Sequence, residues 1–274
     1  MIIDNLKLVV ERNKEKNPLY LRNLLKEQLQ YYVLSFVYNS IYAERFLFKG
    51  GTCLRFCFDL PRLSEDLDFD VEDFENLSFE QFLSDLKNYF EKTLYYSNLE
   101  ITISGVNKII YLKFPILESL GFPANPARPT ENILHLRIDL ARVRGSGFIK
   151  ELSLKSTYDF SFLIRRYALS DLYVGKLAAI IKREKWEGEE KVARFKGRDF
   201  FDIWWLKEKN ITRNNKYLSS LTKISSEKEI KKLINTKMQE AVRKKNELKA
   251  DLLPFFENPL FVENFVNNLE SLRF

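Results

Sequence analysis

Histidine and cysteine are scarce in this chain, which has one histidine and two cysteines among 274 residues. A single histidine, His135, excludes sites that need two, such as His-rich zinc centres and HExxH proteases. Hydrolysis by a nucleophile and a histidine is left only if His135 carries it. Cys53 and Cys57 lie four apart on one expected helix, which favours buried thiols over a disulfide or a metal site.

Long apolar runs are also missing. No run approaches the ~18 residues of a membrane-spanning helix, and the opening stretch MIIDNLKLVVERNKEK is too short and too charged for a signal peptide. We therefore expect a cytoplasmic protein. Hydrophobic residues make up 45% of the chain, which is ordinary for a globular protein and excludes general disorder. The length predicts one large or two modest domains, and the net charge of +6 is compatible with a polyanionic partner.

The chemistry-bearing residues that are present concentrate in residues 48–70, FKGGTCLRFCFDLPRLSEDLDFD. In an extended strand, Asp66, Asp68 and Asp70 project to one side and the apolar residues between them to the other. Neighbouring carboxylates repel one another. A hard divalent cation such as Mg²⁺ removes that cost and also meets substrate phosphates. The alternation therefore predicts half of a metal site.

A glycine pair precedes this strand by about a dozen residues. Gly50 and Gly51 follow an expected strand at 46–48, where they would let backbone amides approach a phosphate closely. Thr52 would add a hydroxyl donor and cap the helix that follows. The alternative is an acidic edge strand after an ordinary turn. Arg62 argues against it, because the acids then have a charge partner that an edge does not need.

A second alternating segment, NILHLRIDLARV, places His135, Arg137 and Asp139 on one face of an expected strand. Asp139 is a candidate third carboxylate, as metal ligand or as base for an attacking hydroxyl. Pairing of Asp139 with Arg137 or Arg142 at the surface is the equally open alternative. Other expected elements are helices at 21–41 and 78–94 and strands at 99–104 and 108–116, followed by a proline-rich loop from Gly121.

Helical periods dominate from Ser170 onward, which predicts a domain boundary near 160–170. An expected helix from Ser170 to Trp186 carries Lys176 and Arg183 on one face. That face would address phosphates. The segment 182–198 that follows is rich in basic residues, although glutamates dilute them, and a solvated charged surface is the structural alternative for it. Further helices are expected at 226–251 and 262–272.

The segment GRDFFDIWWL puts three charges among aromatic residues on one helix. Asp199 and Asp202 lie three apart, and Arg198 precedes Asp202 by four. Charges beside so much apolar surface need partners, and Lys176 is a candidate. A helix-to-helix salt bridge is the structural alternative.

Three motifs in this order resemble the AbiEii/AbiGii toxin family of nucleotidyltransferase-like proteins from abortive-infection systems, over most of the chain. The first motif is a Gly-Gly-Thr/Ser turn followed by Arg-x-Ser-x-Asp-x-Asp, which residues 50–52 and 62–68 meet. The second is a helix with a lysine and an arginine, and the third is Arg-Asp-x-x-Asp at residues 198–202.

The resemblance implies an α+β fold. A nucleotidyltransferase (polymerase-β-like) mixed-sheet domain with N-terminal helices, residues 1–165, would precede a helical domain, residues 166–274. It implies Mg²⁺ or Mn²⁺, a nucleoside triphosphate as donor and transfer of a nucleotidyl group. In related toxins the acceptor can be the 3′ end of transfer RNA, and a cognate antitoxin is the implied partner in phage defence.

Transferred to this sequence, the resemblance predicts three groups of site residues. The catalytic group is Asp66, Asp68, Lys176, Asp199 and Asp202. The nucleotide-binding group is Lys49, Gly50, Gly51, Thr52, Arg62, Ser64, Arg183 and Arg198. The metal ligands are Asp66 and Asp68, with Asp139 as a third candidate from the strand pattern.

Two rival functions stay open at this stage. A small-molecule nucleotidyltransferase, such as one acting on aminoglycosides, would use the same carboxylates, although its cationic acceptor favours an acidic cleft and the second half of this chain is basic. A non-catalytic module that binds a nucleotide or a partner protein is the other rival, against which the intact Asp66 and Asp68 argue.

Overall fold

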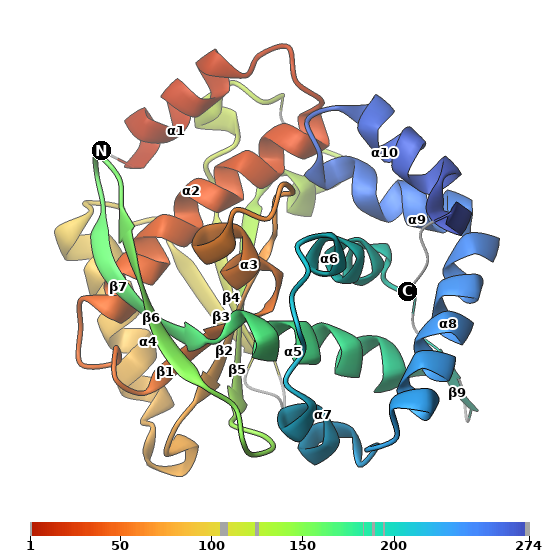
Figure 1. Ribbon diagram of the computed structural model, residues 1–274. Helices are drawn as coiled ribbons and strands as arrows, with labels where there is room; N and C mark the ends of the chain where they lie inside the picture. The colour runs from red at the N-terminus through yellow and green to blue at the C-terminus, as the bar shows by residue number, and fades with distance from the viewer. Residues whose placement is uncertain are drawn as a thin grey trace. The chain divides into compact units, whose positions relative to one another are not determined.

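A seven-stranded mixed sheet with helices forms most of the first part of the chain (Figure 1). The computed structural model describes residues 2–104, 109–123, 126–182, 184–187, 190–193 and 195–271. It divides into two compact units. The first unit is Met1–Phe58, Leu63–Val143 and Leu152–Arg166, and the second is Asp59–Arg62, Arg144–Glu151 and Tyr167–Phe274.

The strand order of the sheet is β3-β4-β5-β2-β1-β7-β6. The strands are β1 (Phe46–Lys49), β2 (Asp66–Val71), β3 (Glu100–Ser104), β4 (Ile109–Phe114), β5 (Leu134–Arg142), β6 (Lys150–Ser156) and β7 (Ser161–Tyr167). Strand β2 is antiparallel to β1 and parallel to β5, and β1 is parallel to β7. The three strands at the other edge, β3, β4 and β5, pair antiparallel.

One face of this sheet is apolar and packs against helices. Phe46 stacks on Phe82 at 5.2 Å between ring centroids, and Phe48 stacks on Phe69 at 5.1 Å. All four rings are fully buried, and burial of one such side chain contributes roughly 1.5–3 kcal/mol. The period-two pattern of β2 therefore holds the carboxylates of the alternate residues on the opposite face.

The helices of the first unit begin and end at recognisable residues. They are α1 (Ile2–Arg12), α2 (Pro18–Tyr38), α3 (Gly50–Phe58) and α4 (Phe79–Asn88). Asn17 caps α2 by accepting from the Leu19 amide, and Ser78 caps α4 by accepting from the Gln81 amide. Both cysteines lie on α3, as the sequence predicts; Cys53 is buried as expected, whereas Cys57 is only half-buried.

The second unit is mainly helical. Its helices are α5 (Leu169–Lys182), α6 (Gly197–Glu208), α7 (Asn215–Thr222), α8 (Glu227–Arg243), α9 (Lys245–Leu252) and α10 (Pro259–Asn267), with a hairpin of β8 (Glu184–Glu187) and β9 (Glu190–Ala193). Helix α6 contacts α5, α8 and α9, which surround it in Figure 1. The predicted α+β class, a mixed sheet followed by helices, is confirmed. The predicted boundary between residues 165 and 166 stays a prediction.

Several predicted elements differ from the structure. The helix expected through Trp186 ends at Lys182, where the β8–β9 hairpin follows, and the helix expected over 226–251 is two helices that break at Lys244. The backbone of Lys244, with φ −104° and ψ 35°, leaves the helical region there. The last helix begins earlier than expected, because Asn258 caps it by accepting from the Leu260 amide.

Strands β6 and β7 were not predicted from the sequence. In β6, Leu152 and Leu154 alternate with Ser153 and Lys155, but both leucines are exposed, so this alternation does not mark a buried face. A search of the described helices finds none long and apolar enough to cross a membrane.

Candidate nucleotidyl-transfer site

Strand β2 presents three carboxylates on its polar face, as its alternation predicts. Asp66 and Asp68 are half-buried, Asp70 is buried, and the residues between them are fully buried in the core. Strand β1 extends this face with Lys49, whose Nζ lies 2.5 Å from Asp70 Oδ1. Lys49 is thus the neutralising partner of Asp70 in this structure.

The turn before α3 closes directly against one of these carboxylates. Gly50 has φ +81°, a conformation that favours glycine, and a Cβ built on it would lie 2.3 Å from Asp68 Oδ2. Gly50, Gly51 and Thr52 are the first residues of α3, so their amides have no partner within the helix. The turn therefore offers backbone donors immediately beside the carboxylates.

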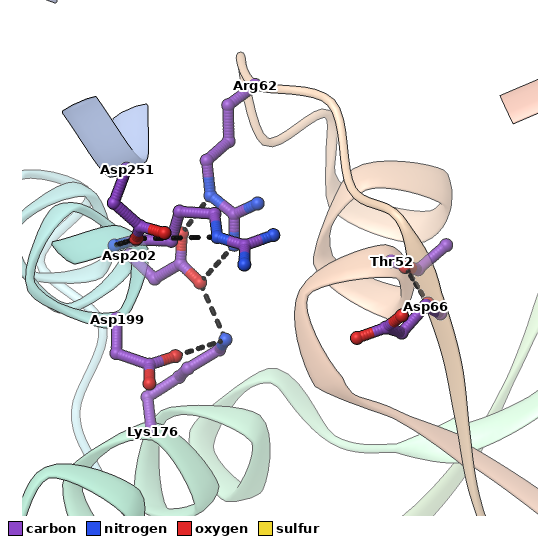
Figure 2. A network of polar contacts seen from close by, with 8 residues as sticks. Thr52, Arg62, Asp66, Lys176, Asp199, Asp202 and Asp251 are labelled. Carbon is purple, nitrogen blue, oxygen red and sulfur yellow. Dashed lines mark hydrogen bonds and ion pairs between the residues drawn. The ribbon is translucent and has the colours of Figure 1, made fainter. Parts of the chain in front are cut away.

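Thr52 lies inside the first turn of α3 and does not cap it, because the helix already begins at Gly50. Its Oγ1 donates to the backbone oxygen of Asp66 (Figure 2). The expectation of a Thr52 cap is wrong, and the hydroxyl instead ties α3 to the first residue of β2.

Strand β5 adds a fourth carboxylate through its pairing with β2. In the register, Asp139 is opposite Asp68 and Arg137 is opposite Asp66. Arg137 Nη2 lies 2.8 Å from Asp139 Oδ2, and Arg137 Nη1 lies 3.8 Å from Asp66 Oδ2. The pairing of Asp139 with Arg137 is therefore present, whereas Arg142 pairs with Glu75. We call Asp66, Asp68, Asp139 and Arg137 the sheet cluster.

Charge is poorly balanced in the sheet cluster. Burial, and then the nearby charge of Asp68, raise the pKa of Asp139, although Arg137 and Lys49 oppose this. Asp68 forms no ion pair within the part of the chain that the structure describes. With Asp70 and Lys49 included, four carboxylates face two cations, a formal net charge of −2.

The donor set suits a hard divalent cation, since Mg²⁺ and Mn²⁺ prefer carboxylate oxygens. Within the described residues, no three histidine, cysteine or acidic side chains are grouped closely enough to hold a metal ion. Asp66 and Asp68 therefore remain the principal ligand candidates, with Asp139 held by Arg137.

Lys176 of the second motif and two aspartates of the third form a separate set inside the second unit, together with Arg62 of the first motif. Arg62 donates from Nε to Asp202 Oδ1 and from Nη2 to Asp202 Oδ2, both at 2.6 Å. Lys176 Nζ lies 2.7 Å from Asp202 Oδ2 and 3.0 Å from Asp199 Oδ1 (Figure 2). We call Arg62, Lys176, Asp199 and Asp202 the buried network. It confirms Lys176 as the partner of both aspartates.

Paired charges outweigh burial in the buried network. Burial alone raises the pKa of Asp202, but Arg62 and Lys176 more than offset it and the pKa is lowered. Burial likewise lowers the pKa of Lys176, and the carboxylates of Asp199 and Asp202 reverse the effect so that it is raised. Both groups are therefore charged at neutral pH.

The residues of the three motifs thus lie in two charged sites, the sheet cluster and the buried network. A match to a family model identifies the family of the chain. Residues 34–264 match the model described as "Nucleotidyl transferase AbiEii toxin, Type IV TA system". The chain belongs to the AbiEii family. As an AbiEii protein it is a nucleotidyltransferase and a toxin of a type IV toxin-antitoxin system, with a nucleoside triphosphate as substrate and an antitoxin as partner.

Solved structures with a similar fold include two bacterial proteins. JHP933 from Helicobacter pylori is 15% identical to the AbiEii chain, with a TM-score of 0.46, and the match covers 91% of this chain and 89% of that one. The nucleotidyltransferase toxin MenT4 from Mycobacterium tuberculosis H37Rv is 14% identical, with a TM-score of 0.47 and coverage of 98% and 99%. No curated protein matches the chain.

Three of the predicted nucleotide-binding residues of this AbiEii chain contact other groups of the protein: Ser64, Arg198 and Arg62. Ser64 is buried, and its backbone oxygen accepts from Gln30 Nε2 at 2.9 Å. Arg198 donates its amide to Asp251 Oδ2 at 2.9 Å, and its guanidinium lies over the Phe255 ring at 4.1 Å. Arg183 lies outside the described residues. Arg62, expected as the charge partner of the acids on β2, pairs with Asp202 instead.

Sequence reasoning underrated two charged residues. Arg137 was considered only as a surface partner of Asp139, although the alternation of β5 already placed it on the same face. Asp251 carried no motif signal at all, because the turn of α9 that brings it to Arg198 depends on helix packing. The position of Arg137 among the carboxylates could thus have been predicted from the strand pattern, whereas the contact of Asp251 with Arg198 could not.

Proposed function

We propose that this AbiEii chain transfers a nucleotidyl group from a nucleoside triphosphate to the 3′ end of an RNA, with transfer RNA as the first candidate, in a reaction that needs Mg²⁺ or Mn²⁺. The observation that carries the proposal is the sheet cluster beside the Gly50 turn. We place the reaction in the cytoplasm, where the proposed acceptor occurs.

The metal requirement is supported by the oxygen donors and the charge of the site. Asp66 and Asp68 would hold the cation, with Asp139 as a third candidate ligand. A bound divalent cation would supply charge neutralisation at the triphosphate and favour attack of the RNA 3′ hydroxyl on the α-phosphorus, with pyrophosphate as the leaving group. The close approach of Gly50 to Asp68 leaves no space for a side chain between the turn and the carboxylate.

The turn itself supports triphosphate binding. The amides of Gly50, Gly51 and Thr52 form the N-terminal end of α3, where unpaired N–H groups and the helix dipole favour an anion. Lys49 adds a cation on the adjacent strand. The Thr52 hydroxyl is already engaged by Asp66, so we propose a role for its amide alone.

The roles of the second unit are proposed from the motifs. Asp199 and Asp202 would orient the Lys176 ammonium, from which their carboxylate oxygens lie 3.0 and 2.7 Å away. Charge stabilisation of the reaction by Lys176, and nucleotide contacts by Arg62, Ser64, Arg183 and Arg198, stay predictions. The net charge of +6 suits a polyanionic acceptor.

The test is incubation of the purified chain with Mg²⁺, each α-³²P-labelled nucleoside triphosphate and total RNA. We expect label in an RNA of transfer-RNA size with one preferred nucleotide, and loss of label without Mg²⁺. The double variant Asp66→Asn with Asp68→Asn is expected to reduce the rate by about 10³-fold or more, because it removes both proposed ligands.

The matched control is Glu100→Gln with Glu118→Gln, which removes two exposed carboxylates of the same unit. It should keep the wild-type rate. Full activity of the Asp66 and Asp68 double variant would contradict the metal site, and label on a small molecule in place of RNA would contradict the proposed acceptor.

A further inference from the structure

Arg137 has a position that the proposed function does not use. It is the register partner of Asp66 and comes two residues before Asp139 on the same face of β5. Its Nη2 lies 2.8 Å from Asp139 Oδ2, while its Nη1 is 3.8 Å from Asp66 Oδ2. One guanidinium therefore contacts carboxylates on both of the strands that would hold the metal.

The contacts of Arg137 are incomplete. Among the described residues its Nε is buried and has no hydrogen-bond partner, and only one of its two carboxylate contacts is as short as a hydrogen bond. A buried donor without a partner is costly. Arg137 is thus held in this position chiefly by the charge of the cluster.

A guanidinium and a divalent cation would compete for the same oxygens. The sheet cluster with Asp70 and Lys49 has a formal charge of −2 while Arg137 is counted in it. A dication bound by Asp66 and Asp68 would repel the Arg137 guanidinium, which contacts both Asp66 and Asp139, and would attract the Asp139 carboxylate away from it. Metal binding and the Arg137–Asp139 pair are therefore linked.

We propose that Arg137 is the resident counter-cation of the sheet cluster: it holds Asp139 while no divalent cation is bound and releases it when one binds. The proposal rests on the proposed function, since it assumes that Asp66 and Asp68 hold the metal. It makes Arg137 a positioning residue that sets the affinity of the site for metal.

The first test is Mn²⁺ binding, measured by electron paramagnetic resonance without nucleotide. Arg137→Met keeps most of the volume and removes the charge, and we expect it to bind Mn²⁺ about tenfold more tightly than wild type, a change of ~1.4 kcal/mol. Arg142→Met is the matched control. It removes one positive charge from the same strand but from a residue paired with Glu75, and its affinity should stay within about twofold of wild type.

The second readout is thermal unfolding with EDTA and with saturating Mn²⁺. Arg137→Met should lower the Tm in EDTA, because the carboxylates then repel one another, and the difference should shrink with Mn²⁺. Adding Asp139→Asn to Arg137→Met should restore the Tm in EDTA, and Arg137→Lys should behave as wild type. A merely structural role for Arg137 would leave the Tm deficit unchanged by Mn²⁺.

The outcomes separate this inference from the proposed function. If wild type binds no Mn²⁺, the proposed metal site fails and this inference fails with it. If wild type binds Mn²⁺ and Arg137→Met binds it no more tightly, only the inference is overturned.

A measurement on the wild-type chain covers the case in which Arg137→Met does not fold. The Nε resonance of ¹⁵N-arginine, assigned by its loss in Arg137→Lys, should move when Mg²⁺ is added. An unmoved resonance at saturating Mg²⁺ would contradict the release of Arg137.

Discussion

The sheet cluster and the buried network combine aspartates with basic residues in opposite ways. In the buried network the side chains of Arg62 and Asp202 are 2% and 0% exposed, and both oxygens of Asp202 are bonded. In the sheet cluster Arg137 and Asp139 are 34% and 29% exposed, and Asp68 has no ion pair within the described residues. Two cations meet two carboxylates in the network, whereas the cluster has three carboxylates and one cation.

The difference follows from the cost of burial. A fully buried charge is tolerable only when it is paired and hydrogen-bonded, so the buried network must be complete and its contribution is to the folded state. A half-exposed cluster keeps some hydration and can remain short of cations. That deficit is what a metal ion and its substrate can use, and it supports our proposal that the metal binds at the sheet cluster.

The largest effect that separates the two sites is expected from Asp202→Asn. It leaves Arg62 without its carboxylate in a buried place, and we expect the free energy of unfolding in urea to fall by about 3–5 kcal/mol. Asp68→Asn, the matched change in the sheet cluster, should leave stability unchanged or raise it, because it relieves repulsion. Equal losses of unfolding free energy for Asp202→Asn and Asp68→Asn would contradict the difference between the buried network and the sheet cluster.

A smaller effect is expected at the Gly50 turn. In Gly50→Ala the new residue must adopt a positive φ, and its Cβ would lie 2.3 Å from Asp68 Oδ2. We therefore expect both the transfer rate and the stability to fall. Gly121→Ala is the control. Gly121 has φ +85° with nothing within 4 Å of the added Cβ, and only the conformational cost of about 1–2 kcal/mol should appear. Urea unfolding and the labelling assay measure the two effects, and a Gly50→Ala rate equal to that of Gly121→Ala would contradict the role of the turn.

The smallest effect expected is that Asp202 and Asp139 change the stability of the protein with pH in opposite directions. Because the pKa of Asp202 is lowered, the ionised Asp202 carboxylate stabilises the folded state above pH 3.8. This stabilisation is lost as the pH falls through the pKa of Asp202 in the folded protein. The pKa of Asp139 is raised above 3.8, so folding loses stability as the pH rises from 3.8 through its folded value. Asp139→Asn should therefore become more stable relative to wild type as the pH rises, as urea unfolding between pH 3.5 and 7 would show. A difference that does not vary with pH would contradict the raised pKa.

Much of the site could be predicted because it depends on local pattern. The alternation of β2 alone puts Asp66, Asp68 and Asp70 on the face opposite the core, and the capped start of α4 is visible in Ser78 and Gln81. The family resemblance supplied the order of the motifs and the reaction class. The roles of individual site residues remain predictions.

The features that could not be predicted depend on residues that are distant in the sequence. Arg62 was expected beside the acids four residues later, yet its carboxylate is Asp202, 140 residues along the chain. The exposure of Leu152 and Leu154 on β6 and the break at Lys244 could not be predicted either, because packing against the rest of the chain decides both.

By itself the sequence determined which side chains share a strand face or a helix turn, since backbone geometry sets those periods of 2 and 3.6 residues. Only the tertiary structure decided which charges meet. The β2–β5 register brought Asp139 and Arg137 to Asp68 and Asp66, and packing of the second unit joined Arg62 and Lys176 to Asp202. The physical reason is that a charge pairs with whatever the folded chain brings within a few ångströms, and sequence distance does not enter that choice.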